Sequence, residues 1–439
     1  MALVTAIKVG RLIDGNGGSA LRNATVLVEG KRIKVVGASA SVQVPPGVAV
    51  IDAPTLTMMP GMMDLHIHMN MFNNLTFKNY RVAQWEVSPQ LQQMYMLFHA
   101  QLCLERGFTT LRDLGYISAH GLMTKSSVAV RDAIEAGIFS GPRIITGAFT
   151  VGTGSHLDLI NPRASFRPEG ITADGPHEMR KLARKNLLAG ADWLKTCASG
   201  GGGTDKEAPD VRNHTQEELD AISDEAHAQH KLVSVHCFTP AAQRMAIEAG
   251  ADTIEHMVFH DADALERIIE SGTPVTPTLA HRTDHAIEIR RETGTPKFTL
   301  EKMKMIQPHC FETFQVMHKA GVKIAMGTDM GFEPDMGSNA DELAIYVDLG
   351  MTPMEAIQTA TKNAAEALHL QADIGTIEAG KYADLVLVMG DPSEDIRVLK
   401  DRENIHTVFK EGLRVLDRRP GENIRVMPFE YKSWKIIDD

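Results

Sequence analysis

Residues 60–68 have the sequence PGMMDLHIH and end in the pair His66 and His68. The short apolar run before the pair is typical of a buried strand. Side chains alternate along a strand, so two histidines separated by one residue point to the same side. Neutral imidazole is a common metal ligand, and two imidazoles on one side can hold a single ion. Two polar residues at an ordinary strand end would leave the same pattern, so the rest of the chain has to decide.

Short apolar strands alternate with amphipathic helical stretches after this segment. The expected strands cover residues 109–113, 143–146, 193–196, 233–236, 253–256, 274–278 and 323–327. The expected helices cover residues 215–230, 261–271, 300–320 and 352–370. Thr215, followed by Glu218 three residues later, is a typical helix start. Many such units in series predict an α/β fold with a (β/α)8 TIM-type barrel, although an open doubly wound sheet has the same periodicity.

Both ends of the chain are instead rich in short strands separated by turn residues. These strands are expected at residues 6–9, 24–33, 373–388 and 406–412. We therefore expect one small β-sandwich domain, built from the two chain ends. The expected boundaries are residues 1–60 and 373–439 for the sandwich and residues 61–372 for the metal-binding barrel.

Composition limits the class of protein. The chain has 439 residues, of which 43% are hydrophobic and 23% charged, as in globular proteins with a large core. A formal net charge of -11 argues against nucleic acid and anionic membranes as partners. Four cysteines without close spacing favour a reducing compartment over a disulfide framework. The chain shows no signal-like start and no apolar run of about 20 residues, so we expect a cytoplasmic protein.

Further residues able to bind metals lie at or just after the ends of other expected strands. They are Lys195, His236, His256 and Asp329. In a β/α barrel the carboxyl ends of the strands meet on one face, so these residues would share a cavity with His66 and His68. Four histidines and one aspartate suit a divalent transition metal with a position open for water.

Lys195 has two interpretations. Burial favours the neutral amine, which can add carbon dioxide and become an anionic carbamate able to bridge two metals. Alternatively, the lysine stays charged and pairs with an acid such as Glu255 or Asp192. The residues alone favour neither interpretation.

Several motifs together resemble the metal-dependent amidohydrolase superfamily. They are PGMMDLHIH at 60–68, GFTTLRD at 107–113, SGPRI at 140–144, GTD at 327–329 and GTIEAGKYADLV at 375–386. The chain is most similar to the branch of imidazolonepropionase-like proteins, Xaa-Pro and Xaa-Arg dipeptidases, and xenobiotic amide and carbamate hydrolases. The resemblance covers nearly the whole chain.

This resemblance implies two divalent metal ions and a role for each strand-end residue. The implied ligands are His66, His68 and Asp329 for the first metal and His236 and His256 for the second. Lys195, carbamylated by carbon dioxide to N6-carboxylysine, and a hydroxide would bridge both ions. Zinc is the expected metal, while cobalt, manganese and iron suit similar ligands. The hydroxide would attack a carbonyl, and Asp329 would pass its proton to the departing nitrogen.

The resemblance also orders the possible substrates. A bridging lysine is implied to favour hydrolysis over deamination of bases, and Phe238 stands where dipeptidase relatives commonly have tyrosine. A small apolar amide, urea or carbamate, xenobiotic in origin, is therefore the first expectation. A dipeptide or N-acyl amino acid of the Xaa-Pro type is the second, and an imidazolonepropionase-like cyclic amidase or deaminase the third. A metal-free scaffold is the non-enzymatic alternative, disfavoured because all six ligands are present. We also expect a homo-oligomer.

Other residues are expected to contact the substrate. They are His156, Phe238, His281 and Arg282. His156 would polarise the carbonyl or, alternatively, only stabilise its loop, and Arg282 would bind a carboxylate or lie at the surface. The glycine-rich residues 199–203 predict a mobile lid or a close backbone approach. Met69, Met71 and Phe72 are expected to form an apolar wall near the first metal.

Overall fold

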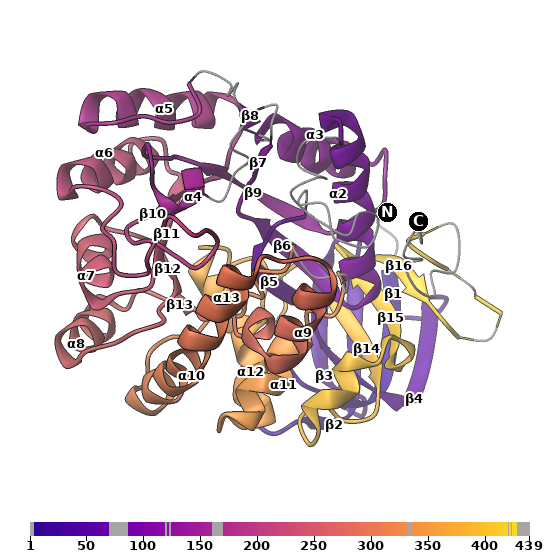
Figure 1. Cartoon of the computed structure of the whole chain (residues 1–439). Coiled ribbons are helices and arrows are strands. Elements are labelled where there is room, and N and C mark those ends of the chain that lie inside the picture. The colour runs from indigo at the N-terminus through magenta and orange to yellow at the C-terminus, as the bar shows by residue number, and fades with distance from the viewer. Residues whose placement is uncertain are drawn as a thin grey trace.

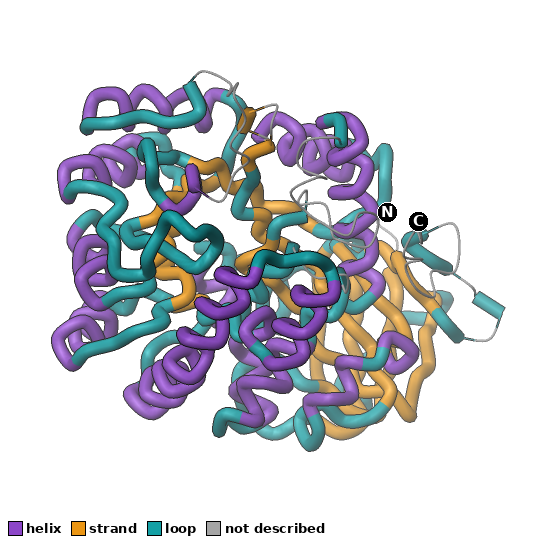
Figure 2. Tube along the Cα trace, in the orientation of Figure 1, coloured by secondary structure: helices purple, strands orange, loops and turns teal. Residues whose placement is uncertain are grey.

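The computed structural model describes most of the chain. The described residues are 4–69, 87–118, 121–122, 124–159, 170–331, 336–419, 421–422 and 424–427. They form a barrel of parallel strands with helices around it, and a separate mixed sheet beside the barrel (Figures 1 and 2).

Seven parallel strands form the barrel sheet. They are β5 (Met62–Ile67), β6 (Phe108–Asp113), β9 (Arg143–Phe149), β10 (Trp193–Cys197), β11 (Leu232–Cys237), β12 (Thr253–His256) and β13 (Val275–Thr276). Their order is β13-β12-β11-β10-β9-β6-β5. Residues 323–330 lie between the two edge strands, with Ile324 paired to Val275 and Met330 paired to Ile67. This eighth segment joins the first strand to the last, so the predicted barrel is confirmed and the open sheet is excluded.

Helices connect the strands and cover the outside of the barrel (Figure 1). They are α2 (Pro89–Glu105), α3 (Thr124–Glu135), α4 (His156–Leu159), α5 (Pro176–Leu188), α6 (Gln216–His227), α7 (Pro240–Glu248), α8 (Ala262–Ser271), η1 (Ala280–Arg282), α9 (Asp284–Glu292), α10 (Lys297–Ala320), α11 (Asp341–Asp348), α12 (Pro353–Thr359) and α13 (Lys362–Ala367). Thr215 and Glu218 form the predicted capping box before α6. In the part of the chain that the structure describes, no helix has the length and apolar character needed to cross a membrane.

The prediction of one helix over residues 352–370 is wrong, because α12 and α13 are separate helices. The carbonyl of Thr359 accepts a hydrogen bond from the Met326 N–H at 2.9 Å, and the carbonyl of Ala360 accepts one from the Met63 N–H at 2.8 Å. These two carbonyls therefore point to the barrel strands and cannot continue the helix. The break anchors the last helices to the amino end of the barrel.

The two chain ends meet in the second sheet. Its strands are β1 (Val4–Leu12), β2 (Leu21–Glu29), β3 (Arg32–Ala38), β4 (Ala49–Pro60), β14 (Leu385–Met389), β15 (Ile405–Lys410) and β16 (Leu413–Asp417). Strand β4 pairs in parallel with β1 and antiparallel with β14, so it joins the N-terminal strands to the C-terminal ones. Alternating apolar residues such as Ile7, Val26 and Leu385 share one core. The predicted β-sandwich from both chain ends is confirmed.

Candidate active site

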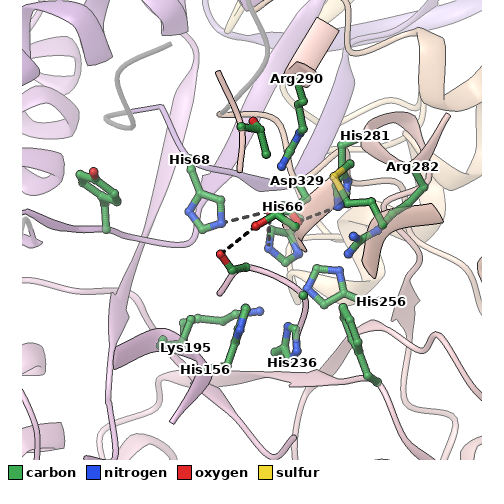
Figure 3. Close-up of a pocket in the computed structure, with 18 of the residues that line it drawn as sticks. His66, His68, His156, Lys195, His236, His256, His281, Arg282, Arg290 and Asp329 are labelled. Atoms are coloured by element: carbon green, nitrogen blue, oxygen red, sulfur yellow. Dashed lines mark hydrogen bonds and ion pairs between the residues drawn. The ribbon is translucent and has the colours of Figure 1, made fainter. Parts of the chain in front are cut away.

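The carboxyl ends of the barrel strands surround one cavity (Figure 3). The structure brings together all the predicted metal ligands and the four residues expected to contact the substrate. These residues are His66, His68, His156, Lys195, His236, Phe238, His256, His281, Arg282 and Asp329. The cavity is also lined by residues that the sequence analysis missed, among them Arg290 of α9, Phe149 and Thr299.

Three of the histidines are oriented by a contact through Nδ1. Each Nδ1 atom lies 2.7 Å from an acceptor oxygen. The pairs are His66 with Glu255, His68 with the Gly115 carbonyl, and His256 with Thr278. An Nδ1–H group that donates to this oxygen leaves Nε2 directed at the cavity with its lone pair free.

The carboxylate of Asp329 lies among these rings (Figure 3). Its Oδ1 atom is 3.5 Å from Nε2 of His66 and 3.2 Å from Nε2 of His68, and its Oδ2 atom is 3.2 Å from Nε2 of His281. One ligand atom each from His66, His256 and Asp329 fall within 4.8 Å of one another, a spacing suited to one divalent ion. Burial acts to raise the pKa of Asp329, but His281 and His66 outweigh it and hold the pKa well below its usual value. Asp329 is therefore a carboxylate at neutral pH.

Lys195 is buried within β10. Its Nζ atom makes no hydrogen bond within the described residues. The two acids considered as partners are engaged elsewhere, Glu255 with Arg112 at 2.7 Å and Asp192 with Arg131 at 2.7 Å. Burial lowers the pKa of Lys195, which favours the neutral amine. Lys195 therefore makes no hydrogen bond to Glu255 or Asp192, and the choice between its two interpretations stays a prediction.

The ring of His236 is packed between two other rings. Its centroid lies 4.4 Å from that of His156 and 4.4 Å from that of Phe238, both nearly parallel to it. Nε2 of His236 lies 3.2 Å from the Gly200 carbonyl oxygen. Burial lowers the pKa of both His236 and His256 well below the usual value, so both rings are in the neutral form that binds metals.

Backbone strain is concentrated at the same cavity. His256, Thr278 and Asp329 have φ angles of 75°, 56° and 56°, in the left-handed region. Each such residue costs about 1–3 kcal/mol unless the surroundings enforce it, and strain of this kind clusters at functional sites. The strain thus coincides with the strand ends that carry the candidate ligands.

A buried carboxylate, Asp64, fixes β5 to the eighth segment. It accepts hydrogen bonds from the N–H of His66 at 3.0 Å, the N–H and hydroxyl of Thr328 at 3.1 and 2.7 Å, and the amide of Asn339 at 2.7 Å. Because His66 and Asp329 lie on these two segments, Asp64 holds them at a fixed separation.

An ion pair crosses the barrel interior behind His66. Arg112 donates to Oε1 of Glu255 at 2.7 Å, and the hydroxyls of Thr253 and Ser234 donate to the same atom at 2.6 and 2.8 Å. Burial acts to raise the pKa of Glu255, but Arg112 and His66 outweigh it and hold that pKa well below the usual value. The sequence analysis considered Glu255 only as a partner of Lys195. The signal in the sequence that could have revealed this ion pair was one charged residue within each of two mainly apolar strands, Arg112 in β6 and Glu255 in β12.

Two arginines face the cavity from beyond β13 (Figure 3). Arg282 and Arg290 are each only 7% exposed, so the alternative of a surface position for Arg282 is excluded. The guanidinium of Arg282 lies 5.4 Å from the ring centroid of Phe238. Arg290 was missed because it stands next to Arg291 on a polar helix, and the sequence does not distinguish the two.

The apolar wall differs from the expectation. Met69 packs in the barrel core, and its N–H donates to Asp113 at 3.1 Å, so it is not part of the described cavity lining. Met71 and Phe72 lie outside the described residues. The described apolar lining includes Phe149, Leu157 and Met303.

Residues 57–415 match the amidohydrolase family, and the chain belongs to that family. It is a hydrolase that acts on C–N bonds, from a family whose members generally bind divalent metals. Ochratoxinase of Aspergillus niger is 31% identical over 437 residues, covering 94% of this chain and 86% of that protein. Its crystal structure has a TM-score of 0.81 at 30% identity and covers 96% of this chain and 97% of its own.

Two further crystal structures are similar over almost the whole chain. A Xaa-Pro dipeptidase with methionine bound in its active site has a TM-score of 0.83 at 31% identity, covering 94% of this chain and 99% of that chain. Phenylurea hydrolase B has a TM-score of 0.76 at 26% identity, covering 94% of this chain and 96% of that chain.

Proposed function

We propose that this protein is a binuclear metal-dependent hydrolase that cleaves the amide bond of a small substrate carrying a free carboxylate. One observation carries the proposal: a buried amine with no hydrogen-bond partner among the described residues and four histidine rings surround a single carboxylate at the strand ends. The proposed ligands are His66, His68 and Asp329 for one ion and His236 and His256 for the other. Carbamylated Lys195 would bridge them.

This donor set fits two divalent ions. The Nζ atom of Lys195 is buried with no hydrogen-bond partner within the described residues, which is costly for a free amine. A carbamate at this position would remove the orphaned group and supply the negative charge that two cations need. Zinc is the first choice for a mixed imidazole and carboxylate set, with cobalt, manganese and iron as alternatives. When bound, the metals polarise the scissile carbonyl and make water a stronger acid.

Asp329 is the proposed proton carrier. Its low pKa keeps it ionised and so able to accept a proton, and its contact with Nε2 of His281 at 3.2 Å orients the second carboxylate oxygen. Asp329 would take a proton from the attacking water and deliver it to the departing nitrogen. His156, in the cavity wall beside His236, would contact the substrate carbonyl.

Arg282 and Arg290 support a substrate with a carboxylate. Guanidinium groups bind carboxylates through two parallel hydrogen bonds, and burial strengthens such pairs. A dipeptide, the substrate that the Xaa-Pro dipeptidase is named for, ends in this group. The arginines therefore move an N-acyl amino acid or dipeptide ahead of an uncharged amide, urea or carbamate.

An uncharged apolar amide, urea or carbamate is the second candidate. Phe238 and Phe149 give the cavity apolar surface, and phenylurea hydrolase B is similar over 94% of the chain. Such a substrate would not need the arginines, so the free carboxylate is the feature that separates the two candidates.

A matched substrate panel tests the proposal. Purified protein, loaded with zinc and bicarbonate, would be assayed with N-acyl amino acids and dipeptides, with their C-terminal methyl amides, and with phenylureas. We expect release of the free amino acid, at least ~10-fold faster from each free acid than from its methyl amide, because tenfold corresponds to ~1.4 kcal/mol of lost ion pairing. Faster cleavage of the uncharged compounds would favour the second candidate. Ammonia released only from a heterocycle would overturn the proposal.

Metal analysis of the same protein tests the cofactor. About two ions per chain are expected after loading. Less than one ion per chain, without activity after zinc and bicarbonate, would favour the metal-free scaffold.

A further inference from the structure

The glutamate Glu207 connects two parts of the cavity wall through one buried carboxylate. Its Oε2 atom lies 2.7 Å from Nδ1 of His156 and accepts the N–H of Gly201 at 3.0 Å. Its Oε1 atom accepts the N–H of Thr204 at 3.0 Å. The Glu207 side chain is 1% exposed. One carboxylate therefore fixes both the imidazole and the segment that passes over it.

The glycine-rich segment 199–203 lies directly on the His156 ring. A Cβ atom added to Gly201 would come within 2.4 Å of His156 Cε1, and one added to Gly200 within 2.1 Å of the Ala208 carbonyl oxygen. Only glycine permits these contacts, so the close backbone approach expected from the sequence is confirmed. Gly202 and Gly203 in turn line the cavity.

Helix α10 holds the same segment through two side chains. The ammonium of Lys302 donates to the carbonyls of Thr204 and Glu207, and the hydroxyl of Thr299 donates to the Gly203 carbonyl at 3.3 Å. These two contacts from α10 restrain only the backbone. Of the three side chains described here as holding the segment, that of Glu207 also contacts the His156 ring, whereas the His156 N–H donates to Asn213 at 2.8 Å.

We propose that Glu207 is a positioning residue that holds the His156 ring and residues 201–204 in the arrangement that binds the substrate. This inference rests on the proposed function, since it assigns Glu207 to the same cavity. The Glu207 carboxylate holds the ring of His156 through Nδ1, which leaves Nε2 for the substrate. Burial acts to raise the pKa of Glu207, but His156 and the segment's N–H groups lower that pKa to about 2, so the group is ionised at working pH.

A double-mutant cycle tests whether Glu207 acts through His156. We expect Glu207→Ala to lower kcat/KM by about 10- to 100-fold, as for other residues that orient a functional histidine. Glu207→Gln, which keeps one acceptor oxygen, should recover part of this loss. In a His156→Ala background, Glu207→Ala should cost much less than in the wild type. Equal losses in both backgrounds would overturn the positioning role.

Lys302→Met is the matched control, because it removes the hydrogen bonds from α10 to the carbonyls of Thr204 and Glu207 without changing a contact of His156. We expect it to raise KM while leaving kcat nearly unchanged, whereas Glu207→Ala lowers kcat. A fall in kcat as large as that of Glu207→Ala would mean that general loosening of the segment explains both variants, and this would also overturn the proposal.

Hydrogen–deuterium exchange provides a readout that does not depend on activity. Peptides covering residues 199–207 should exchange at least ~10-fold faster in Glu207→Ala than in the wild type, because Gly201 and Thr204 lose their acceptor. Unchanged exchange would contradict the proposed contacts even if activity fell. Faster exchange in a protein that hydrolyses no substrate would keep the contacts and reject only the proposed function.

Discussion

Buried charge is arranged in opposite ways behind and in front of the His66 ring. Behind the ring, in the barrel interior, Arg112 and Glu255 are fully paired with each other and with neighbouring hydroxyls. In front, on the cavity side, Lys195 has no hydrogen-bond partner among the described residues. A fully satisfied polar network is rigid, whereas an orphaned buried amine is unfavourable until a ligand compensates it. The comparison separates the support of the site from the place where ions and substrate would bind.

The largest expected effect comes from the cavity side. Asp329→Asn should lower turnover by about 10³- to 10⁴-fold, because an amide cannot carry the proton from water to the leaving nitrogen. Thermal unfolding should shift little, because the N–H of Asp329 still donates to the His66 carbonyl. Steady-state kinetics and calorimetry measure both effects. Asp348→Asn, an exposed carboxylate on α11, is the control, and near wild-type turnover of Asp329→Asn would remove its proposed role.

Lys195→Ala tests the orphaned amine. We expect loss of bound metal and a fall in activity of about 10²- to 10³-fold, since loss of a residue that only orients a metal ligand costs about 10- to 100-fold and loss of a ligand should cost more. Acetate or propionate should restore part of the bound metal and part of the activity by occupying the place of the carbamate. Lys231→Ala, which removes a half-exposed partner of Asp192, should retain metal and activity. Full metal content in Lys195→Ala would show that the lysine is not a ligand.

A change behind the ring should mainly affect stability. Glu255→Gln leaves Arg112 as a buried charge without its counter-ion and should lower the free energy of unfolding by about 3 kcal/mol. Urea unfolding measures this loss. Glu366→Gln, a surface partner of Lys323, provides the baseline for an exposed ion pair. A loss of metal without loss of stability would instead show that Glu255 supports metal binding rather than the stability of the barrel.

The smallest expected effect concerns Glu342, which supports the segment carrying His281 and Arg282. Its carboxylate accepts the N–H groups of Leu279 and Ala280 at 2.7 and 2.5 Å, and burial raises its pKa to about 8. Because this pKa is above the unfolded value of 4.5, the folded state binds the extra proton, and stability falls as the pH rises from about 5 towards 8. The slope for one such group is at most about 1.4 kcal/mol per pH unit.

Glu342→Gln should remove this slope. Urea unfolding of the wild type and the variant at pH 6 and pH 8 measures the difference directly. If both lose the same stability between these two values, Glu342 is not the group that titrates.

Much of the barrel, and the gathering of the candidate ligands at its strand ends, could be predicted from the sequence. Parallel strands carry their chemistry at the carboxyl ends, so the positions of His236 and His256 at the ends of apolar runs were sufficient to place them in one cavity. The capping box at Thr215 is likewise a local signal. Such features depend on neighbours in the sequence or on a rule of the fold.

The remainder depends on contacts between distant segments. Glu207 lies in a loop without periodicity, and its partner His156 is 51 positions away. Arg290 and Arg291 are adjacent and chemically identical, and only the packing of α9 decides which of them enters the cavity. The break between α12 and α13 follows from hydrogen bonds to Met326 of the eighth segment and to Met63 of β5, the latter nearly 300 residues earlier in the chain.

The eighth segment, residues 323–330, has a consequence for the order of events during synthesis. Asp329 leaves the ribosome about 260 residues after His66, which at 5–20 residues per second is a delay on the order of 10–50 s. During this interval the chain lacks the segment that joins β5 to β13. Translation therefore delivers the group proposed to move the proton after the rest of the pocket, so a chain interrupted before that codon would lack hydrolytic activity.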